Sequence, residues 1–456
     1  MGVEKDIIVA VELASTAIRA IAGKKEPDGT MQILAVAQDE AINTIHKGVV
    51  DNIDKTTQAI RQVVRQIDER LNVHTKKIYV GLSGQSLHSI RNSVSRQFPE
   101  KTQISHAIVD EMKDTNLGLV YPNAVILDVI PQEYRMGNRQ VTEPVGMQSD
   151  QIEASFLNIV ARTSLKENIE KCVQEAGFEL AELLISPICL ADSLLTPGEK
   201  RSGCALVDMG AETTTVSVFH AGILRHLAVI PLGGANVTAD IAANNIETEE
   251  AEALKLKYAT TYRNEVEGTT AKSITLSHNR TIDELVLQEI IEARYEELFA
   301  NIWYHINERS ERLLSGIILT GGAARVSDIV DGFCKHVRYD KQIRLAKGLP
   351  VNITTAPGVH IDTPDTLYTL MALLQKGDQP CVGEMPTEST AVQEELRFEP
   401  EGELKPEEKP AEPAVEEKPE EAEPANKEPK KPRESFGKKL RGLWEKVSDV
   451  FEEPED

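Results

Sequence analysis

Long apolar runs are missing from this sequence, and aromatic residues are scarce. Only 4% of its 456 residues are Phe, Trp or Tyr, and no uninterrupted apolar stretch approaches the roughly 20 residues that a membrane-spanning helix needs. The N-terminus lacks the basic and then apolar layout of a secretory signal peptide. These absences argue against helical membrane spans and predict a cytoplasmic protein.

Cysteine is also rare. The five cysteines are scattered, odd in number and free of any Cys-x-x-Cys pair, which fits buried thiols in a reducing compartment better than disulfides or a zinc site. They are Cys172, Cys189, Cys204, Cys334 and Cys381.

Positive charge is in short supply, because 50 Lys and Arg face 73 Asp and Glu, giving a net charge of -23. Wrapping a nucleic-acid backbone requires clustered basic residues, so we expect no nucleic-acid partner. The sequence also lacks a Walker A lysine loop, Gly-x-Gly-x-x-Gly, His-Glu-x-x-His and Gly-x-Ser-x-Gly. The common catalytic signatures are therefore absent.

One pattern of strands and turns occurs twice in a chain long enough for two or more domains. In the first copy, the apolar run 7–11 is followed by Glu12 and a small, hydroxyl-bearing turn at 13–16. In the second copy, an apolar run ends in Asp208 and is followed by the turn 210–214. Each turn leads into two further apolar runs separated by a tight turn. Both stretches therefore predict three short strands with an acid at the end of the first.

The two patterns suggest a phosphate site. A small hydroxyl turn after a strand can direct backbone N–H groups and Ser or Thr oxygens at a phosphate, and the acid can hold a hydrated magnesium ion. One such hairpin is weak support, since most are ordinary hairpins. Two facing hairpins predict a nucleotide clamped between two related domains.

The segments around the hairpins complete the expected domains. A helix capped by Asp54 leads into a buried strand at 78–82, and the altered texture of 86–159 predicts a small α+β insertion. Gly233 and Gly234 precede a helix whose free N-terminal amides offer another phosphate contact. A strand at 316–319 runs into a glycine pair and then a helix from about residue 326, where the bare backbone would let a flat base approach.

The C-terminal region differs in kind. Residues 377–433 hold ten of the 22 prolines and 17 acidic against 8 basic residues, which predicts a disordered, self-repelling linker. The pattern of residues 434–452 predicts an amphipathic helix with Ser435 as its N-cap and basic residues outside the apolar arc. We expect this helix to lie in a membrane surface, with docking onto a protein groove as the alternative. Its apolar face carries Phe436, Leu440, Leu443, Trp444, Val447, Val450 and Phe451.

Together these features resemble the FtsA family of actin-like membrane tethers in bacterial cell division. The resemblance rests on the two hairpins, VIPLGGANVTADIA, EAEALKLKY, IILTGGAARVSDI and the acidic linker with its basic amphipathic helix. It implies an α/β, actin/Hsp70-like two-lobe ATPase fold with a duplicated core, a small α+β insertion in the first lobe and a disordered tail. The implied domains are a first-lobe core (1–83 with 161–200 and 350–376), the insertion (84–160), a second-lobe core (201–235 and 311–349), an outer subdomain (236–310), the linker (377–433) and the membrane helix (434–452).

The resemblance also implies a site for ATP and Mg²⁺ in the cleft between the lobes. Glu12 and Asp208 would hold the magnesium ion through water, and the hairpins and the glycine loop would surround the phosphates. Glu252 and Lys255 match the ribose and adenine contacts. The implied nucleotide-binding residues are Glu12, Ala14, Ser15, Thr16, Asp208, Gly210, Ala211, Thr213, Thr214, Gly233, Gly234, Glu252, Lys255, Gly321, Gly322 and Ala323.

The hairpins depart from the family pattern. Glu12 and Ala14 stand where the family usually has Asp and Gly, and Ala211, Glu212 and Thr215 stand where it usually has glycines or an aspartate. Each lost glycine removes backbone freedom, and an inward-pointing Glu212 would repel a triphosphate. We therefore expect weakened or altered nucleotide binding and at most slow ATP hydrolysis, since no residue is a convincing general base.

The function implied by the resemblance is that of a structural adaptor. It would bind ATP, form actin-like filaments with itself, and tether the tubulin-like FtsZ ring to the inner face of the cell membrane at the septum. Its implied partners are the FtsZ C-terminal peptide, gripped by residues 236–310, anionic lipids and other division proteins. Two alternatives share the fold: the actin-like protein of type IV pilus assembly, and a kinase of the sugar- and acetate-kinase branch.

Overall fold

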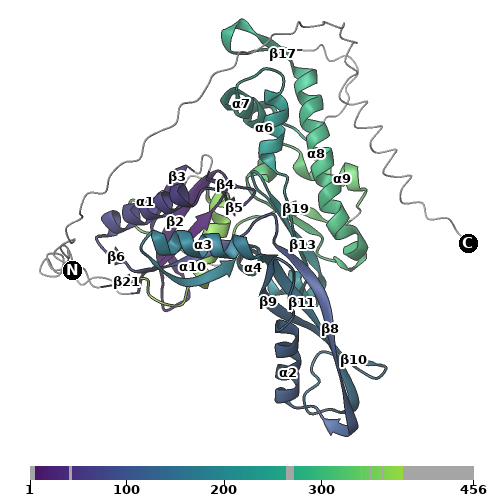
Figure 1. Cartoon of the computed structure of the whole chain (residues 1–456). Helices are drawn as coiled ribbons and strands as arrows, with labels where there is room; N and C mark the ends of the chain where they lie inside the picture. Colours follow the sequence, from purple (N-terminus) through teal and green to yellow (C-terminus); the bar gives the residue numbers. More distant parts are fainter. Residues whose placement is uncertain are drawn as a thin grey trace, which may run out of the picture. The chain divides into compact units, whose positions relative to one another are not determined.

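The computed structural model describes residues 6–40, 44–262, 272–339, 341–349, 352–361 and 363–383. These residues belong to one compact unit, which Figure 1 shows as two lobes and a projecting subdomain. The expected amphipathic helix at 434–452, with its seven apolar positions and Ser435, lies outside the described residues.

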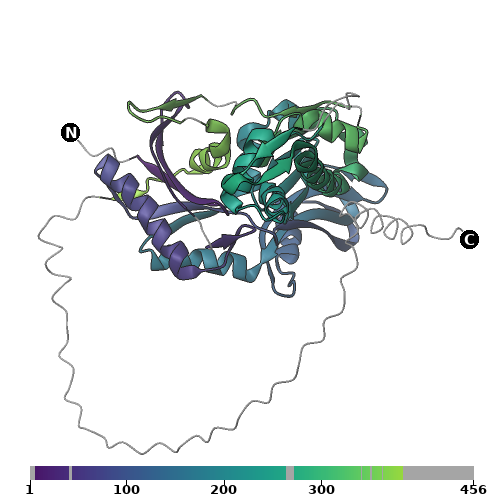
Figure 2. The ribbon, with the colours of Figure 1, turned by 90° about the horizontal axis from the view of Figure 1, so that it is seen from above.

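The first lobe is built on a six-stranded sheet. Its strand order is β12-β7-β1-β2-β3-β20, with β1–β2–β3 antiparallel and β7 and β12 parallel to β1. Helices α1 (Ile53–Leu71) and α3 (Thr163–Glu175) cover one face, and α4 (Ser186–Leu194) and α10 (Tyr368–Lys376) cover the other (Figure 2). The strands are β1 (Ile8–Leu13), β2 (Ala17–Lys25), β3 (Met31–Glu40), β7 (Lys77–Leu82), β12 (Glu179–Ile185) and β20 (Ile353–Thr355).

The second lobe repeats this arrangement. Three antiparallel strands, β13, β14 and β15, are followed by β18 parallel to β13 and β19 parallel to β18. The order β15-β14-β13-β18-β19 thus corresponds to β3-β2-β1-β7-β12 of the first lobe, which confirms the predicted duplication. These strands are β13 (Cys204–Met209), β14 (Thr214–His220), β15 (Ile223–Ile230), β18 (Ile317–Thr320) and β19 (Ile343–Leu345).

The inserted subdomain interrupts the sequence of the first lobe, but its strands extend the sheet of the second lobe. Its strands pair in the order β10-β9-β11-β8, and β8 meets β15 through the single pair His88 and Ala228. A buried amide ladder fixes its helix α2 to the sheet, because Asn116 exchanges hydrogen bonds with Asn158 and accepts one from Asn92. The elements are β8 (His88–Gln103), α2 (His106–Leu117), β9 (Ala124–Met136), β10 (Arg139–Val141) and β11 (Gln148–Arg162).

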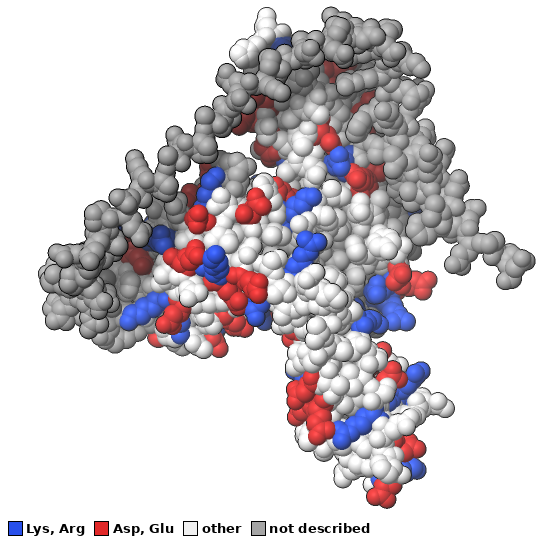
Figure 3. Space-filling model, viewed as in Figure 1, with Lys and Arg blue, Asp and Glu red and all other residues white. Residues whose placement is uncertain are grey.

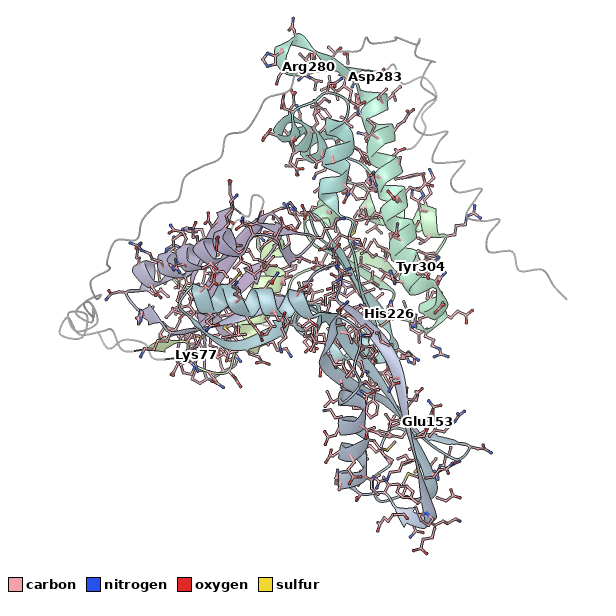
Figure 4. The ribbon with its side chains drawn as sticks, in the orientation of Figure 1. Lys77, Glu153, His226, Arg280, Asp283 and Tyr304 are labelled. Atoms are coloured by element: carbon pink, nitrogen blue, oxygen red, sulfur yellow. The ribbon has the colours of Figure 1, made fainter. Side chains whose placement is uncertain are left out.

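The outer part of the second lobe is mainly helical. The long helix α8 (Glu284–Ile306) begins at Asp283, whose carboxylate accepts a hydrogen bond from Leu285 N, and its buried positions include Tyr295 and Phe299. A short hairpin at the outer end carries Arg280 and Asp283, labelled in Figure 4. The other elements are α6 (Gly234–Ala242), α7 (Thr248–Tyr258), β16 (Ser273–Thr275), β17 (Thr281–Asp283) and α9 (Ile329–Val337).

Two expectations about segment ends are wrong. The cap of α1 is Asn52 rather than Asp54, because the Asn52 side chain accepts a hydrogen bond from Lys55 N while Asp54 already lies in the first helical turn. The segment 377–383, expected to begin the linker, packs on the first lobe.

Tyr79 and Lys77 hold this segment in place. The Tyr79 hydroxyl accepts hydrogen bonds from the backbone N–H groups of Asp378 and Gln379, and the ammonium of Lys77 (Figure 4) donates to the Gln379 side chain. The segment ends in β21 (Val382–Gly383), which pairs with β6 (His74–Thr75). The expected linker therefore loses its first seven residues to the folded unit.

Acidic and basic side chains are interspersed over the face of the described unit in Figure 3. None of the helices in the described part of the chain is long and apolar enough to cross a membrane.

Candidate functional site

A cleft with a volume of about 700 Å³ lies between the two hairpins. The ends of β1 and β13 bring the two predicted turns to opposite sides of this cleft, as the duplicated topology requires. Fourteen of the sixteen predicted nucleotide-binding residues line it. They are Glu12, Ala14, Ser15, Thr16, Asp208, Gly210, Ala211, Thr213, Gly234, Glu252, Lys255, Gly321, Gly322 and Ala323.

Thr214 is one of the two predicted residues that do not line the cleft. It is fully buried, and its hydroxyl donates a hydrogen bond to the Leu232 carbonyl at 2.9 Å. Successive side chains on a strand point to opposite faces, so Thr215 of β14 faces the cleft while Thr214 faces the interior. Its role is to join the second hairpin to the chain that follows β15.

Gly233 is the other exception, and it also changes the expected role of the helix that follows. A β-carbon on Gly233 would lie 2.5 Å from the carbonyl oxygens of Gly210 and Ala211, so glycine allows α6 to pack directly on the second hairpin. The amides of Gly234 and Ala235 donate to those same carbonyls at 3.0 and 2.7 Å. The prediction that these amides are free for phosphate is therefore wrong.

Two half-buried acids, Glu12 and Asp208, face the cleft from the ends of the first strands. Burial raises the pKa of Glu12 to about 7, with Arg19 lowering it and Asp208 raising it, and burial raises the pKa of Asp208 to about 6. Glu12 Oε2 lies 3.6 Å from Arg19 Nη1 and has no hydrogen bond among the described residues.

A divalent cation fits this arrangement, because it would offset the repulsion between two carboxylates and satisfy the unpaired oxygen of Glu12. No cluster of three or more His, Cys, Asp or Glu side chains with metal-binding geometry occurs among the described residues. Glu12 and Asp208 alone would therefore hold the ion, with water molecules supplying the remaining ligands.

Glu212 has a specific partner that the sequence did not reveal. Its Oε2 lies 2.5 Å from the backbone nitrogen of Lys47, and its Oε1 lies 3.6 Å from His46 Nδ1. Both partners belong to the loop between β4 (Ile45–His46) and β5 (Val49–Val50) of the first lobe. The carboxylate therefore links the second hairpin to the opposite lobe at the edge of the cleft.

Glu252 and Lys255 form part of a network rather than an isolated solvated pair. The Lys255 ammonium donates to Glu252 Oε2 at 2.7 Å, to the Thr238 hydroxyl at 2.9 Å and to the Gly234 carbonyl at 3.2 Å. The network fixes α7 against the start of α6 and holds both side chains at the cleft wall.

The turn after β18 comes close to the second hairpin. Gly321 has a φ of +91°, which favours glycine, and the carbonyl of Ala323 accepts a hydrogen bond from the buried Tyr295 hydroxyl at 2.9 Å. Residues 322–325 form a short 3₁₀ turn, and α9 begins only at Ile329. The helix expected from about residue 326 therefore starts three residues later.

Several cleft residues were not predicted. Arg19 was missed although it lies opposite Glu12 in the β1–β2 pairing, a relation that an antiparallel register would have indicated. Others come from segments with no phosphate-type pattern. They include Ser186, Pro187 and Leu190 of α4, Arg325, and Tyr368 at the start of α10.

Comparisons with known proteins agree on one family. A family model described as cell division protein FtsA matches residues 205–454, and a model of the SHS2 domain inserted in FtsA matches residues 84–160. The cell division protein FtsA of Porphyromonas gingivalis is 29% identical, covering 98% of this chain and 97% of that protein. FtsA of Enterococcus hirae is 30% identical, covering 71% and 74%.

A solved structure supports the fold. A chain of the PilM–PilN type IV pilus biogenesis complex superposes with a TM-score of 0.56 at 14% identity, covering 80% of this chain and 97% of that chain. Together with the duplicated core and the matched insertion, this similarity gives the chain the actin-like fold with an inserted SHS2 domain.

Proposed function

The chain belongs to the FtsA family of cell division proteins, and we propose that it acts as an adaptor which binds ATP with Mg²⁺ between its two hairpins. The observation that carries this proposal is the pair of half-buried acids, Glu12 and Asp208, in a cleft lined by both hydroxyl-bearing turns. A magnesium ion bound with the nucleotide would supply positive charge beside these acids, and the turns would surround the phosphates.

Isothermal titration of the full chain with ATP tests this site. We expect ATP to bind more tightly with Mg²⁺ than with EDTA, because the ion would reduce the repulsion between the carboxylates of Glu12 and Asp208 and the phosphates. Asp208→Asn should remove most of the dependence on Mg²⁺ while the folded protein keeps its circular dichroism spectrum. Equal ATP affinities with and without Mg²⁺ would contradict the assignment of Glu12 and Asp208. We expect at most slow hydrolysis, since Ala14 and Ala211 stand where the family usually has glycines in the two phosphate turns.

The adaptor role further requires a membrane contact. We propose that residues 434–452 form an amphipathic helix that lies in a bilayer containing anionic lipids, with seven apolar side chains on its buried face and basic residues beside it. One helix gives reversible binding, and self-association strengthens it by presenting several helices at once. Sedimentation with vesicles should therefore depend steeply on protein concentration, and a simple hyperbolic isotherm would count against this coupling.

The filament partner is proposed to be FtsZ. Its C-terminal peptide would bind the outer subdomain at residues 236–310, so that the protein tethers the FtsZ ring to the inner face of the membrane at the septum. Deleting residues from 434 onward should preserve binding of the FtsZ peptide and abolish septal localisation. Continued septal localisation of the truncated protein would overturn the membrane-anchor proposal.

The two alternatives are weaker. The type IV pilus complex shares the fold, but its 14% identity supports no more than that, and both matching family models belong to FtsA. A kinase of the sugar- and acetate-kinase branch would release phosphate rapidly with a hydroxylated or carboxylated substrate. Such stimulated turnover would count against the adaptor role.

A further inference from the structure

The loop between β4 and β5 connects both hairpins of the cleft. Its Lys47 backbone N–H donates a hydrogen bond to the Glu212 carboxylate of the second hairpin. The next residue, Gly48, donates its N–H to the hydroxyl of Ser15 in the first hairpin at 3.3 Å. The loop is therefore held by one residue of each predicted phosphate-binding turn.

The same loop also packs against the point where the chain enters the inserted subdomain. The Lys47 carbonyl accepts a hydrogen bond from Gln85 N at 3.0 Å. A β-carbon on Gly48 would lie 2.7 Å from Gly84 Cα, and both glycines have positive φ values, +73° and +157°. The two backbones are therefore in direct contact, with no side chain between them to absorb a displacement.

The entry and exit of the inserted subdomain are themselves joined. The Ser86 hydroxyl accepts a hydrogen bond from Arg162 N at 3.2 Å, and Arg162 is the last residue of β11. Leu87 beside it is fully buried. A displacement of the β4–β5 loop would consequently also displace β8 and β11, the two strands that connect the subdomain to the rest of the fold.

We propose that Glu212 couples phosphate in the cleft to the position of the inserted subdomain, through the loop His46–Gly48 and the Gly84 contact. This inference rests on the proposed nucleotide site. A phosphate held between the hairpins lies beside the Glu212 carboxylate and repels it, which weakens its bond to Lys47. The Ser15 hydroxyl can accept the Gly48 hydrogen bond and still donate its own hydrogen to phosphate, so the contact with the first hairpin remains. The ligand thus favours a state in which the loop is released from Glu212 of the second hairpin.

Because thermodynamic coupling is reciprocal, it can be measured both at the Glu212–Lys47 bond and as a change in phosphate affinity. If phosphate weakens the Glu212–Lys47 bond, that bond must weaken phosphate binding by the same factor. Glu212→Gln keeps a side-chain oxygen that accepts the Lys47 hydrogen bond but removes the charge that phosphate repels. This variant should therefore hold the loop in place and bind ATP more tightly, by roughly three- to tenfold for one partly screened repulsion.

Hydrogen exchange of the full chain, read at individual amides, tests the proposal. The amides to follow are those of Lys47, Gln85 and Arg162, with Mg-ATP, with adenosine and without ligand. We expect Mg-ATP to speed exchange at Lys47 by at least about fivefold, the lower end of typical allosteric coupling, with smaller changes at Gln85 and Arg162. Adenosine, which carries no phosphate, should leave all three unchanged.

Two variants complete the experiment. In Glu212→Gln, Mg-ATP should change the exchange rate of the Lys47 amide by less than twofold. Glu167→Gln, a change of an exposed residue of α3, should respond to Mg-ATP as the wild type does. Absence of ATP binding by calorimetry would overturn the proposed function and this coupling with it. ATP binding without a change at Lys47, a response to adenosine equal to that to ATP, or an unaltered response in Glu212→Gln would overturn the coupling alone.

Discussion

Gly321 lies so close to Asp208 that a β-carbon added to the glycine would stand 2.5 Å from the Asp208 Oδ1 atom. The same β-carbon would be 2.5 Å from the Met209 carbonyl oxygen. Gly321 also has a φ of +91°, so both space and backbone conformation require glycine there. The turn after β18 is thereby pressed against the acid that is proposed to hold Mg²⁺.

Gly321→Ala should displace Asp208 and weaken the site. We expect it to lower the free energy of unfolding by about 1 to 3 kcal/mol through backbone strain and to reduce ATP affinity in the presence of Mg²⁺. Urea denaturation and calorimetry measure the two effects. For the free energy of unfolding, Gly322→Ala is the matched control, because a β-carbon there meets nothing within 4 Å. Equal losses of stability in both variants would contradict the specific contact with Asp208.

The raised pKa values of Glu12 and Asp208 predict how the free energy of unfolding depends on pH when no divalent cation is present. Glu12 has a folded-state pKa of about 7, against 4.5 as its ordinary value, so between these values the folded state holds more protons than the unfolded state. The free energy of unfolding must then fall as pH rises. Asp208, raised from 3.8 to about 6, acts in the same direction.

Glu12→Gln should remove part of this dependence. We expect the loss of stability between pH 5 and 7.5 to be smaller in this variant by about 1 to 3 kcal/mol, measured by urea unfolding in EDTA. Millimolar Mg²⁺ should recover stability at pH 7.5 in the wild type and much less in the variant. Glu167→Gln should keep the wild-type slope, and a wild-type slope in Glu12→Gln would rule out a raised pKa.

The Tyr79 hydroxyl predicts a stabilising role for residues 377–383. It accepts two backbone hydrogen bonds from this segment and donates one to the Asp378 carboxylate at 2.9 Å. Tyr79→Phe leaves two backbone donors without this acceptor, so it should destabilise the protein by about 1 to 3 kcal/mol and speed proteolysis just after residue 376. Tyr304→Phe, at a side chain that is 75% exposed, should change neither. Identical cleavage rates in both variants would show that other contacts hold the segment.

The Lys255 ammonium should matter for nucleotide binding through its three hydrogen bonds. In Lys255→Ala, the Glu252 carboxylate loses its cation and α7 its link to the Gly234 carbonyl. We expect ATP affinity to fall about tenfold, in line with losing one or two charge-assisted hydrogen bonds. The control Lys166→Ala, in the exposed pair with Glu170, should leave ATP affinity unchanged. If Lys255→Ala bound ATP as tightly as the wild type, Glu252 and Lys255 would lie outside the site.

Local sequence patterns were sufficient to predict much of the architecture. Alternating apolar residues and small turns predicted the strands of both hairpins, since side-chain period and turn chemistry are local properties. The altered texture of 86–159 lies within the range 84–160 that matches the model of the inserted SHS2 domain. The repeated order of strand, acid and hydroxyl turn covers eight of the fourteen predicted residues that line the cleft. The other six lie outside the hairpins and were assigned to the site through the family resemblance.

The tertiary structure decided what local pattern does not contain. Thr214 turns inward because pairing with β15 sets its face, and the amides after Gly233 are occupied because α6 packs on the second hairpin. The partner of Glu212 lies 165 residues away in the chain, a distance at which composition and spacing give no signal. The sequence determined where the acids, hydroxyls and glycines proposed to bind a magnesium nucleotide occur, and the packing of the two lobes determined which of them face the cleft.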